Sequence, residues 1–432
     1  MGRGSVKSGA IDILRVRDRS FFLTVVLDLD SSLKGDTSKV KRSVVYCHDL
    51  TGLIDHVIEF RGGSVGEYMI KVGIDGGGSF QKFCVNIIRT PDATAKYSEG
   101  TFASKFVDGG EKKLLIIAIV EAVTASYDNL TAILDLLGID RVDFLAAFDM
   151  KLANVFFGLG PHSSACPCPW CELPKNQFSN PDRVIVLRTL GGIRKNAAEY
   201  EAAVQKHERA KPLSAPAFKS CTHQPLTKNL PDETLIIDIL PDMELQIFLG
   251  ITNRLYDLLL RGFSVKANSW SEHLAIRRPP MHGGEFNGQQ CKRLLENIPV
   301  LEELLENAGE SGLRIVNAFS TFNDVRHSCF GMTVQGDYKD SIDKFEIAYR
   351  ELGLQFTSKC HAVVDHISQF LERQGDMFDC ENGLGFWSEQ ASESVHSDFK
   401  SLSDNGYKRD LNHSAYAVNL LRCTTTYNSR HR

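Results

Sequence analysis

Long hydrophobic runs, a leader-like start and a cysteine framework are all missing from this 432-residue sequence. The longest apolar run, Leu114–Val120, is far shorter than the roughly 20 residues that cross a bilayer. The N-terminus lacks the apolar stretch of a secretory signal, so we expect no membrane association. The eleven cysteines are odd in number and mostly scattered, which argues against disulfides and for a reducing compartment. Neither an internal repeat nor a low-complexity tract is visible.

An excess of positive charge is also missing. The net charge is −5, from 49 basic and 54 acidic residues. Contacts to DNA phosphates need clustered Lys and Arg, and only three short candidates exist: Lys39–Arg42, Arg277–Arg278 and Arg430–Arg432. Composition therefore counts mildly against a DNA-binding protein. The 43% hydrophobic and 24% charged content is that of an ordinary globular protein, of two or three domains by its length.

The first 66 residues predict a small α+β subdomain. Residues 21–29 are β-branched and apolar, which predicts a strand. The polar stretch 31–43 predicts a loop. Apolar residues at helical spacing predict a helix over residues 49–60.

Residues 67–160 predict the first part of an α/β core with a mixed sheet. The expected elements are strands at 68–74, 80–88, 113–120 and 142–148, and a helix at 130–137 that begins at Asp128 or Ser126. An Asp-Gly-Gly-Gly stretch joins the first two strands, and glycine supplies the positive φ of a hairpin turn. Three strands, a helix and a fourth strand form the order of an RNase H-like sheet.

The apolar period becomes helical farther along the chain. The expected helices are 232–262, 287–307 and 338–352, followed by 362–373 and 388–401. We interpret residues 161–366 as a long, mostly α-helical insertion that interrupts the core. Residues 367–432 would then be C-terminal helices that complete it.

Cys168-Pro-Trp-Cys171 is the strongest local motif. Two thiolates at this spacing suit one tetrahedral ion, usually zinc in a reducing compartment. A redox pair is the alternative, and the intervening proline and tryptophan leave it open. His361 and His366 are the candidate further ligands, because their spacing puts both imidazoles near one helix turn. They are otherwise two unrelated helix histidines.

Carboxylates form a second candidate site. Asp75 and Asp149 each end a strand, so in a shared sheet they would lie side by side. Paired carboxylates at strand ends can hold two Mg²⁺ ions about 3.5–4 Å apart for phosphoryl transfer. Glu389 and Glu393, one helical turn apart, are candidates for a third carboxylate. The alternatives are a hairpin role for Asp75 and a solvated helix face or capping box for the glutamates.

The stretch Gly73–Ser79 is similar to the first phosphate loop of sugar kinases and actin-like ATPases, in which glycine amides cradle a phosphate. That superfamily needs a second such loop after a strand and an aspartate. The pairs Gly191-Gly192 and Gly283-Gly284 lack both. The kinase is therefore the weaker alternative.

Taken in order, these motifs resemble the catalytic core of Transib-type transposases and of the V(D)J recombinase, which descends from them. The resemblance runs from about Asp75 to the end of the chain. It is carried by Asp75, Asp149, the CxxC, the HxxxxH, the Ser-Glu-x-x-x-Glu helix after Trp387, the phrase from Met281 to Leu295, and Gly385-Phe-Trp-Ser-Glu.

The resemblance implies a DDE-type DNA transposase or recombinase with two Mg²⁺ or Mn²⁺ ions and a structural zinc. Asp75, Asp149 and Glu393, with Glu389 as the fallback, would hold magnesium. Cys168, Cys171, His361 and His366 would hold zinc. A water would nick the DNA, and the freed 3′-hydroxyl would attack a phosphodiester, with no covalent protein intermediate. A nuclear homodimer, acting on DNA with an accessory protein, is expected.

Two departures accompany the resemblance. Only 74 residues precede Asp75, so the recombinase's separate N-terminal DNA-binding and dimerisation regions are mostly absent. The net acidity is unusual for a free-standing transposase. A catalytically inactive, domesticated relative that binds DNA or protein is therefore the main alternative.

Overall fold

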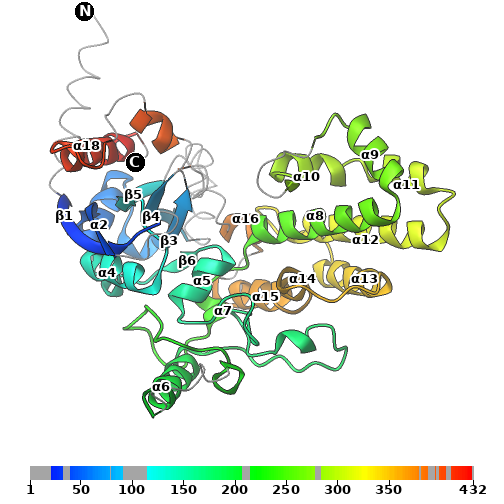
Figure 1. The fold of residues 1–432 in the computed structure, drawn as a ribbon, viewed down its shortest axis with the longest axis horizontal. Coiled ribbons are helices and arrows are strands. Elements are labelled where there is room, and N and C mark those ends of the chain that lie inside the picture. The colour runs from blue at the N-terminus through cyan, green and yellow to red at the C-terminus, as the bar shows by residue number, and fades with distance from the viewer. Residues whose placement is uncertain are drawn as a thin grey trace, which may run out of the picture. The chain divides into compact units, whose positions relative to one another are not determined.

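The computed structural model describes residues 21–32, 39–77, 79–90, 114–206, 215–277, 284–378, 381–387, 395, 398–404 and 410–430. The chain divides into two compact units (Figure 1). The sheet unit comprises Met1–Pro169, Arg188–Leu240 and Glu389–Arg432, and the helical unit comprises Trp170–Leu187 and Pro241–Ser388. Residues 188–240, which the sequence assigned to the insertion, thus belong with the sheet.

The sheet unit contains six strands in a mixed sheet. They are β1 (Phe22–Asp30), β2 (Lys39–Cys47), β3 (Tyr68–Gly77), β4 (Phe80–Arg89), β5 (Leu114–Glu121) and β6 (Leu145–Ala147), in the order β1-β2-β5-β4-β3-β6. All neighbours are antiparallel except β3 and β6, which are parallel. Every residue of β5 is buried, as expected for a strand covered on both faces.

The sheet unit also contains helices, and several of them begin at a capping side chain. They are α2 (Leu50–Phe60), α4 (Tyr127–Leu137), α5 (Met150–Phe156), α6 (Leu190–Lys206), α7 (Ile236–Ile239) and α18 (Tyr416–Asn428), with 3-10 turns at Val65–Glu67, Ile139–Arg141 and Ala215–Phe218. Asp49 accepts a hydrogen bond from the Gly52 amide, and Ser126 accepts one from the Asn129 amide. These bonds satisfy amides that the first turn leaves unpaired. Of the two expected starts of α4, Ser126 is the cap.

Helix α18 packs against β1, β2 and β5, as does α4, and Figure 1 shows α18 above the sheet and α4 below it. The Asn428 side chain pairs with the backbone of Ile116, donating to its carbonyl (2.9 Å) and accepting from its amide (2.8 Å). The register of β4 and β5 shifts between Phe83 and Cys84, next to this point. The Asn428 amide thus satisfies both backbone polar groups of a buried strand residue.

Two sequence expectations for the sheet need correction. Residues 39–43 are not loop but the first half of β2, where Lys39 and Lys41 stand opposite Asp30 and Asp28 of β1, and opposite charges at facing positions favour strand pairing. The fourth strand is also shorter than expected: β6 covers only Leu145–Ala147. The strands at 21–29, 68–74, 80–88 and 113–120 are confirmed within a few residues.

The helical unit confirms that apolar residues at helical spacing form helices in this part of the chain. Its helices are α8 (Glu244–Gly262), α9 (Ser264–His273), α10 (Gly288–Leu295), α11 (Ile298–Leu305), α12 (Gly309–Cys329), α13 (Tyr338–Glu351), α14 (Ser358–Asp365), α15 (Ile367–Phe378) and α16 (Leu384–Trp387), with a 3-10 turn at Lys175–Gln177. Helix α8 contacts α9, α10, α12 and α14. The helix expected at 287–307 is two helices, with Pro299 in the first turn of the second.

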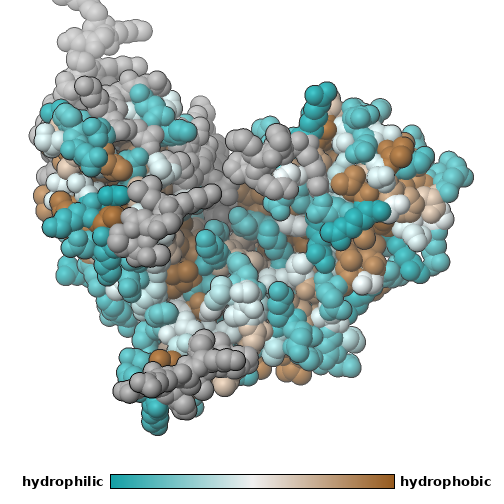
Figure 2. All heavy atoms as spheres, in the orientation of Figure 1, coloured by the Kyte–Doolittle hydropathy of each residue, from teal (hydrophilic) through white to brown (hydrophobic). Residues whose placement is uncertain are grey.

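The surface of the chain shows no uniform character on the face drawn in Figure 2, where hydrophilic residues are interrupted by small hydrophobic patches. Large exposed apolar side chains in the described residues include Val184 (75% exposed) and Val265 (74%). Single exposed apolar side chains of this kind are normal for a folded chain.

Candidate metal centre

Cys168, Cys171, His361 and His366, here called the Cys2His2 cluster, meet in the structure. Their ligand atoms all lie within 4.8 Å of one another, and each side chain is at most 1% exposed. Cys171 Sγ is 3.2 Å from His361 Nε2, which is 3.2 Å from His366 Nε2. Tetrahedral zinc with ordinary bond lengths separates its ligands by about 3.3–3.8 Å. The cluster can therefore hold a metal ion such as zinc.

A break between two helices brings the two histidines together. Thr357 caps α14, which carries His361 and ends at Asp365, and α15 begins at Ile367. On one continuous helix, residues five apart would point about 140° away from each other. His366 sits at the break, with φ −118° and ψ −33°, and its ring centroid is 4.7 Å from that of His361.

The second nitrogen of each imidazole has its own acceptor. His361 Nδ1 lies 2.6 Å from Asp365 Oδ2, and His366 Nδ1 lies 3.1 Å from Gln369 Oε1. Because a carboxylate or amide oxygen accepts, each Nδ1 carries the proton and each Nε2 presents its lone pair to the cluster. This is the arrangement that fixes the tautomer of metal-binding histidines.

A chain of charges supports Asp365. Arg183 Nε donates to both carboxylate oxygens of Asp365 at 2.9 Å, and the same guanidinium pairs with Glu346 at 3.1 Å. The ring of Phe178 stacks on His361, with centroids 4.0 Å apart and planes 10° from parallel. These contacts hold the His361 ring in one orientation.

The same contacts shift the pKa of both His361 and Asp365. Burial by itself lowers the pKa of His361, but the hydrogen bond to Asp365 and the contact with Cys171 outweigh it and raise the pKa. Burial by itself raises the pKa of Asp365, but hydrogen bonds from His361 and Arg183 outweigh it and lower the pKa. Asp365 is therefore an anion beside the cluster.

Three cysteines outside the cluster are buried thiols with a raised pKa. Burial raises the pKa of Cys47, Cys84 and Cys329 to about 12. These thiols stay protonated and pack as small hydrophobic side chains. Only Cys168 and Cys171, among the described cysteines, belong to a group with metal-ligand geometry.

The candidate magnesium ligands lie on and just after the two parallel strands of the sheet. In the pair of β3 and β6, Gly73 stands opposite Ala147. Asp75 and Asp149 each follow two residues later, but only Asp149 follows the end of its strand: the expectation that Asp75 ends a strand was wrong, because β3 continues to Gly77 and pairs Asp75 with Lys82 of β4. Both are half-buried. Asp149 also caps α5, since its Oδ1 accepts from the Leu152 amide at 2.6 Å.

Glu389 and Glu393, the candidates for the third carboxylate, lie outside the described residues. The nearby Phe399 is described and buried, and its ring packs edge-on against Phe80 of β4, with centroids 5.3 Å apart. The segment that follows the glutamates is therefore in contact with β4, next to the strand of Asp75.

Sequence reasoning missed several side chains at these sites. Lys82 stands directly opposite Asp75 in the hairpin, is 2% exposed, and lies between the rings of Phe80 and Phe399. Asp365 was visible in the sequence four residues after His361, which is the spacing of helix neighbours. Lys82 had no comparable signal, because hairpin register depends on the turn.

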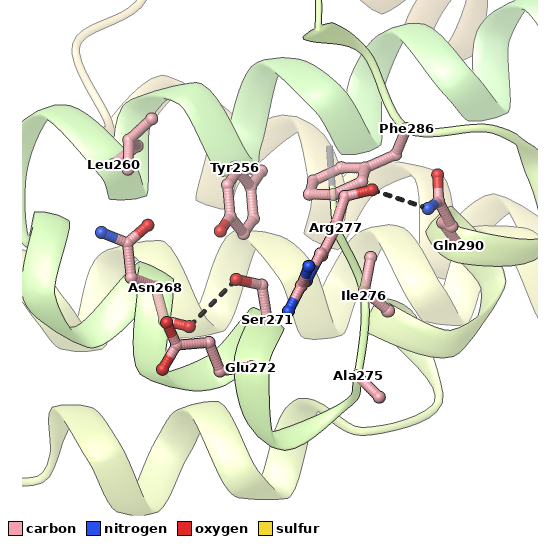
Figure 3. Close-up of a pocket in the computed structure, with 10 residues that line it drawn as sticks. All are labelled: Tyr256, Leu260, Asn268, Ser271, Glu272, Ala275, Ile276, Arg277, Phe286 and Gln290. Carbon is pink, nitrogen blue, oxygen red and sulfur yellow. Dashed lines mark hydrogen bonds between the residues drawn. The ribbon is translucent and has the colours of Figure 1, made fainter. Parts of the chain in front are cut away.

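A hollow of about 790 Å³ lies among α8, α9 and α10 of the helical unit (Figure 3). Tyr256 and Phe286 line it with buried rings. The Gln290 side chain donates to the carbonyl of Arg277 and accepts from the Asn287 amide. Because several of its polar groups are satisfied within the protein, the hollow is a weaker candidate than the Cys2His2 cluster.

No protein family model matches the chain, and no curated protein matches it either. Among the helices of the described residues, none is both long and apolar enough to cross a membrane.

Proposed function

We propose that this chain is a DDE-type DNA transposase or recombinase of transposon origin, with an RNase H-like core. The observation that supports the proposal is the parallel register of β3 and β6, in which Gly73 stands opposite Ala147 and Asp75 and Asp149 each follow two residues later. Two carboxylates at such positions suit a pair of divalent ions.

The sheet order supports the RNase H-like core. Strands β3, β4 and β5 follow one another as antiparallel neighbours, and β6 joins beside β3 in parallel after helix α4. Glu393, with Glu389 as the alternative, is the proposed third carboxylate. The contact of Phe399 with Phe80 supports this assignment, because Phe399, six residues after Glu393 in the sequence, packs against β4.

The Cys2His2 cluster is proposed to hold a structural zinc. Two thiols, two imidazoles with preset tautomers and complete burial are the features of a closed structural site, which keeps no position open for substrate. The cluster therefore supports the fold, and the carboxylates carry the chemistry.

The proposed reaction acts on phosphodiester bonds of DNA. Asp75, Asp149 and Glu393 would bind two Mg²⁺ or Mn²⁺ ions, which when bound activate a water and neutralise charge that develops on the phosphate. A water would cleave one strand, and the freed 3′-hydroxyl would then attack a second phosphodiester. We further propose a nuclear homodimer that acts with an accessory protein.

Nicking of supercoiled plasmid in the presence of Mn²⁺ tests the proposal. We expect the wild type to produce open circles, and D75N and D149N to lose this activity by at least about a hundredfold, since each removes a metal ligand. D143N is the matched control, because Asp143 is exposed just before β6. Calorimetric titration with Mn²⁺ should show binding to the wild type and D143N only.

Other outcomes favour the alternatives. A wild-type chain that binds DNA without nicking it and takes up no Mn²⁺ would indicate a domesticated, inactive relative. ATP binding without DNA binding would indicate the actin-like or sugar-kinase ATPase. Equal nicking by D75N and the wild type would contradict the assignment of the carboxylates.

A further inference from the structure

Arg188 is a buried arginine beneath the cysteine loop of the sheet unit. It is 1% exposed. Its Nε donates to the carbonyl of Cys168 at 3.0 Å, and its Nη2 donates to the carbonyls of Cys166 (3.1 Å) and Lys219 (3.0 Å). Its Nη1 lies 3.7 Å from Cys221 Sγ. A buried guanidinium is costly unless its donors are used in this way.

The loop that leads to Cys168 needs such partners. Its backbone is irregular and is buried at Cys166–Cys168, where no helix or strand pairs its polar groups. The Asn154 side chain donates to the carbonyls of Gly160 and Pro167, both at 3.1 Å, and Ser220 Oγ accepts from the Cys166 amide at 3.0 Å. Three buried side chains therefore fix this loop without any metal.

The chain near Arg188 is itself held in place. The Ile236 amide donates to the Arg188 carbonyl at 3.0 Å. The preceding residue, Leu187, forms an antiparallel bridge with Cys171, and the Glu172 amide donates to the Val186 carbonyl at 2.9 Å. Arg188 thus follows directly on the residue that pairs with the second cysteine.

We infer that Arg188 is a positioning residue of the metal centre, one that fixes the backbone of the first cysteine ligand before a metal arrives. The inference rests on the proposed zinc site. Arg188 touches a ligand residue and not the ligand atom, so its effect is exerted through Cys168. A ligand that is already in place loses less conformational freedom on binding, and the affinity for zinc rises accordingly.

The test compares R188M and R188K with the wild type and with R194M. Arg194 is the matched control, because it also donates to three backbone carbonyls, those of Thr227, Lys228 and Leu230, but contacts no cysteine. Zinc affinity is measured by competition with a chromophoric chelator. The visible spectrum of the Co²⁺-substituted protein reports ligand geometry, and thermal unfolding of metal-free protein reports stability.

We expect R188M to bind zinc about tenfold or more weakly, the scale for groups that orient metal ligands, with an altered Co²⁺ spectrum. R188K, which keeps the charge but loses the fork of donors, should show a smaller loss and remains informative if R188M does not fold. R194M should bind zinc as the wild type does.

Two results would overturn the inference, and they are distinguishable. If R188M and R188K unfold at lower temperature but keep wild-type zinc affinity and Co²⁺ spectrum, Arg188 is a structural residue only. If the wild type binds no zinc, the metal centre itself is wrong and the inference fails with it.

Discussion

His361 has separate partners for its two ring nitrogens. Nε2 faces Cys171 and His366, whereas Nδ1 is bonded to Asp365, which in turn accepts from Arg183. The arginine keeps Asp365 ionised, and the ionised carboxylate keeps the proton of His361 on Nδ1. Arg183 does not contact the cluster itself. Through Asp365 it nevertheless decides which nitrogen of His361 is available to a metal ion.

Replacing the Asp365 carboxylate by an amide should weaken metal binding. We expect D365N to bind zinc about 10–100-fold less tightly, because the neutral amide no longer orients His361 or raises its basicity. Chelator competition measures this. D376N is the control, since Asp376 is exposed on α15. Equal affinities for D365N and D376N would show that the Asp365 contact does not tune the site.

Helix α5 shows how one side chain serves an element and a candidate site together. Asp149 accepts from the Leu152 amide and so caps the helix, and it comes two residues after the end of β6, the parallel neighbour of β3. Asparagine can also cap, but alanine cannot.

The variants D149A and D149N should therefore differ in their free energy of unfolding. We expect D149A to lower the free energy of unfolding by about 0.5–2 kcal/mol, the usual worth of a cap, and D149N to lower it much less. Urea unfolding measures the difference. Both variants should lose Mn²⁺-dependent nicking, so a stable, inactive D149N would separate the two roles. If D149A and D149N are equally stable, the cap is not important for α5.

The pairing of β1 with β2 gives the basic stretch Lys39–Arg42 a structural role in the sheet. Lys39–Arg42 was a candidate for phosphate contacts, but Lys41 stands opposite Asp28 and Lys39 stands opposite Asp30. Opposite charges on facing strands attract each other, and they reduce the positive field that DNA would meet.

Charge reversal in this ladder should change stability more than DNA binding. We expect K41E to lower the free energy of unfolding by about 0.2–1 kcal/mol, because it places like charges opposite each other, and the swap D28K/K41E to restore it. Denaturant unfolding of the double-mutant cycle measures the coupling. If K41E keeps wild-type stability but binds DNA much more weakly, Lys41 contacts DNA and does not stabilise the sheet.

For the whole molecule, metal binding and folding should be linked. An ion that binds only the folded chain stabilises it by about 4 kcal/mol when present at a thousand times its dissociation constant. We expect a chelator to lower the thermal midpoint of the wild type, measured by calorimetry. C168S and H366A should melt at the lower midpoint with or without zinc, and C166S should behave as the wild type does. Insensitivity of the wild type to the chelator would contradict a structural metal.

Much of the fold could be predicted because its causes are local. The hairpin of β3 and β4, the apolar run of β5 and the caps at Asp49 and Ser126 depend on near neighbours in the sequence. The extent of β2 could not be predicted, because its charged first half is strand through its pairing with β1, and nothing in the local sequence shows that pairing. Likewise the expected helix over 362–373 is two helices, interrupted at His366.

For the candidate sites, the residue types and their order could be read from the sequence: two cysteines, two histidines and two aspartates, of which Asp75 proved to lie within β3 and not at its end. Tertiary structure alone decided that Cys171 meets His361 across 190 residues, because loop closure over such a distance leaves no local trace. It also decided that Arg188 lies beneath the cysteine loop. Burial of a charge depends on acceptors that only the folded chain brings together, here the carbonyls of Cys166, Cys168 and Lys219.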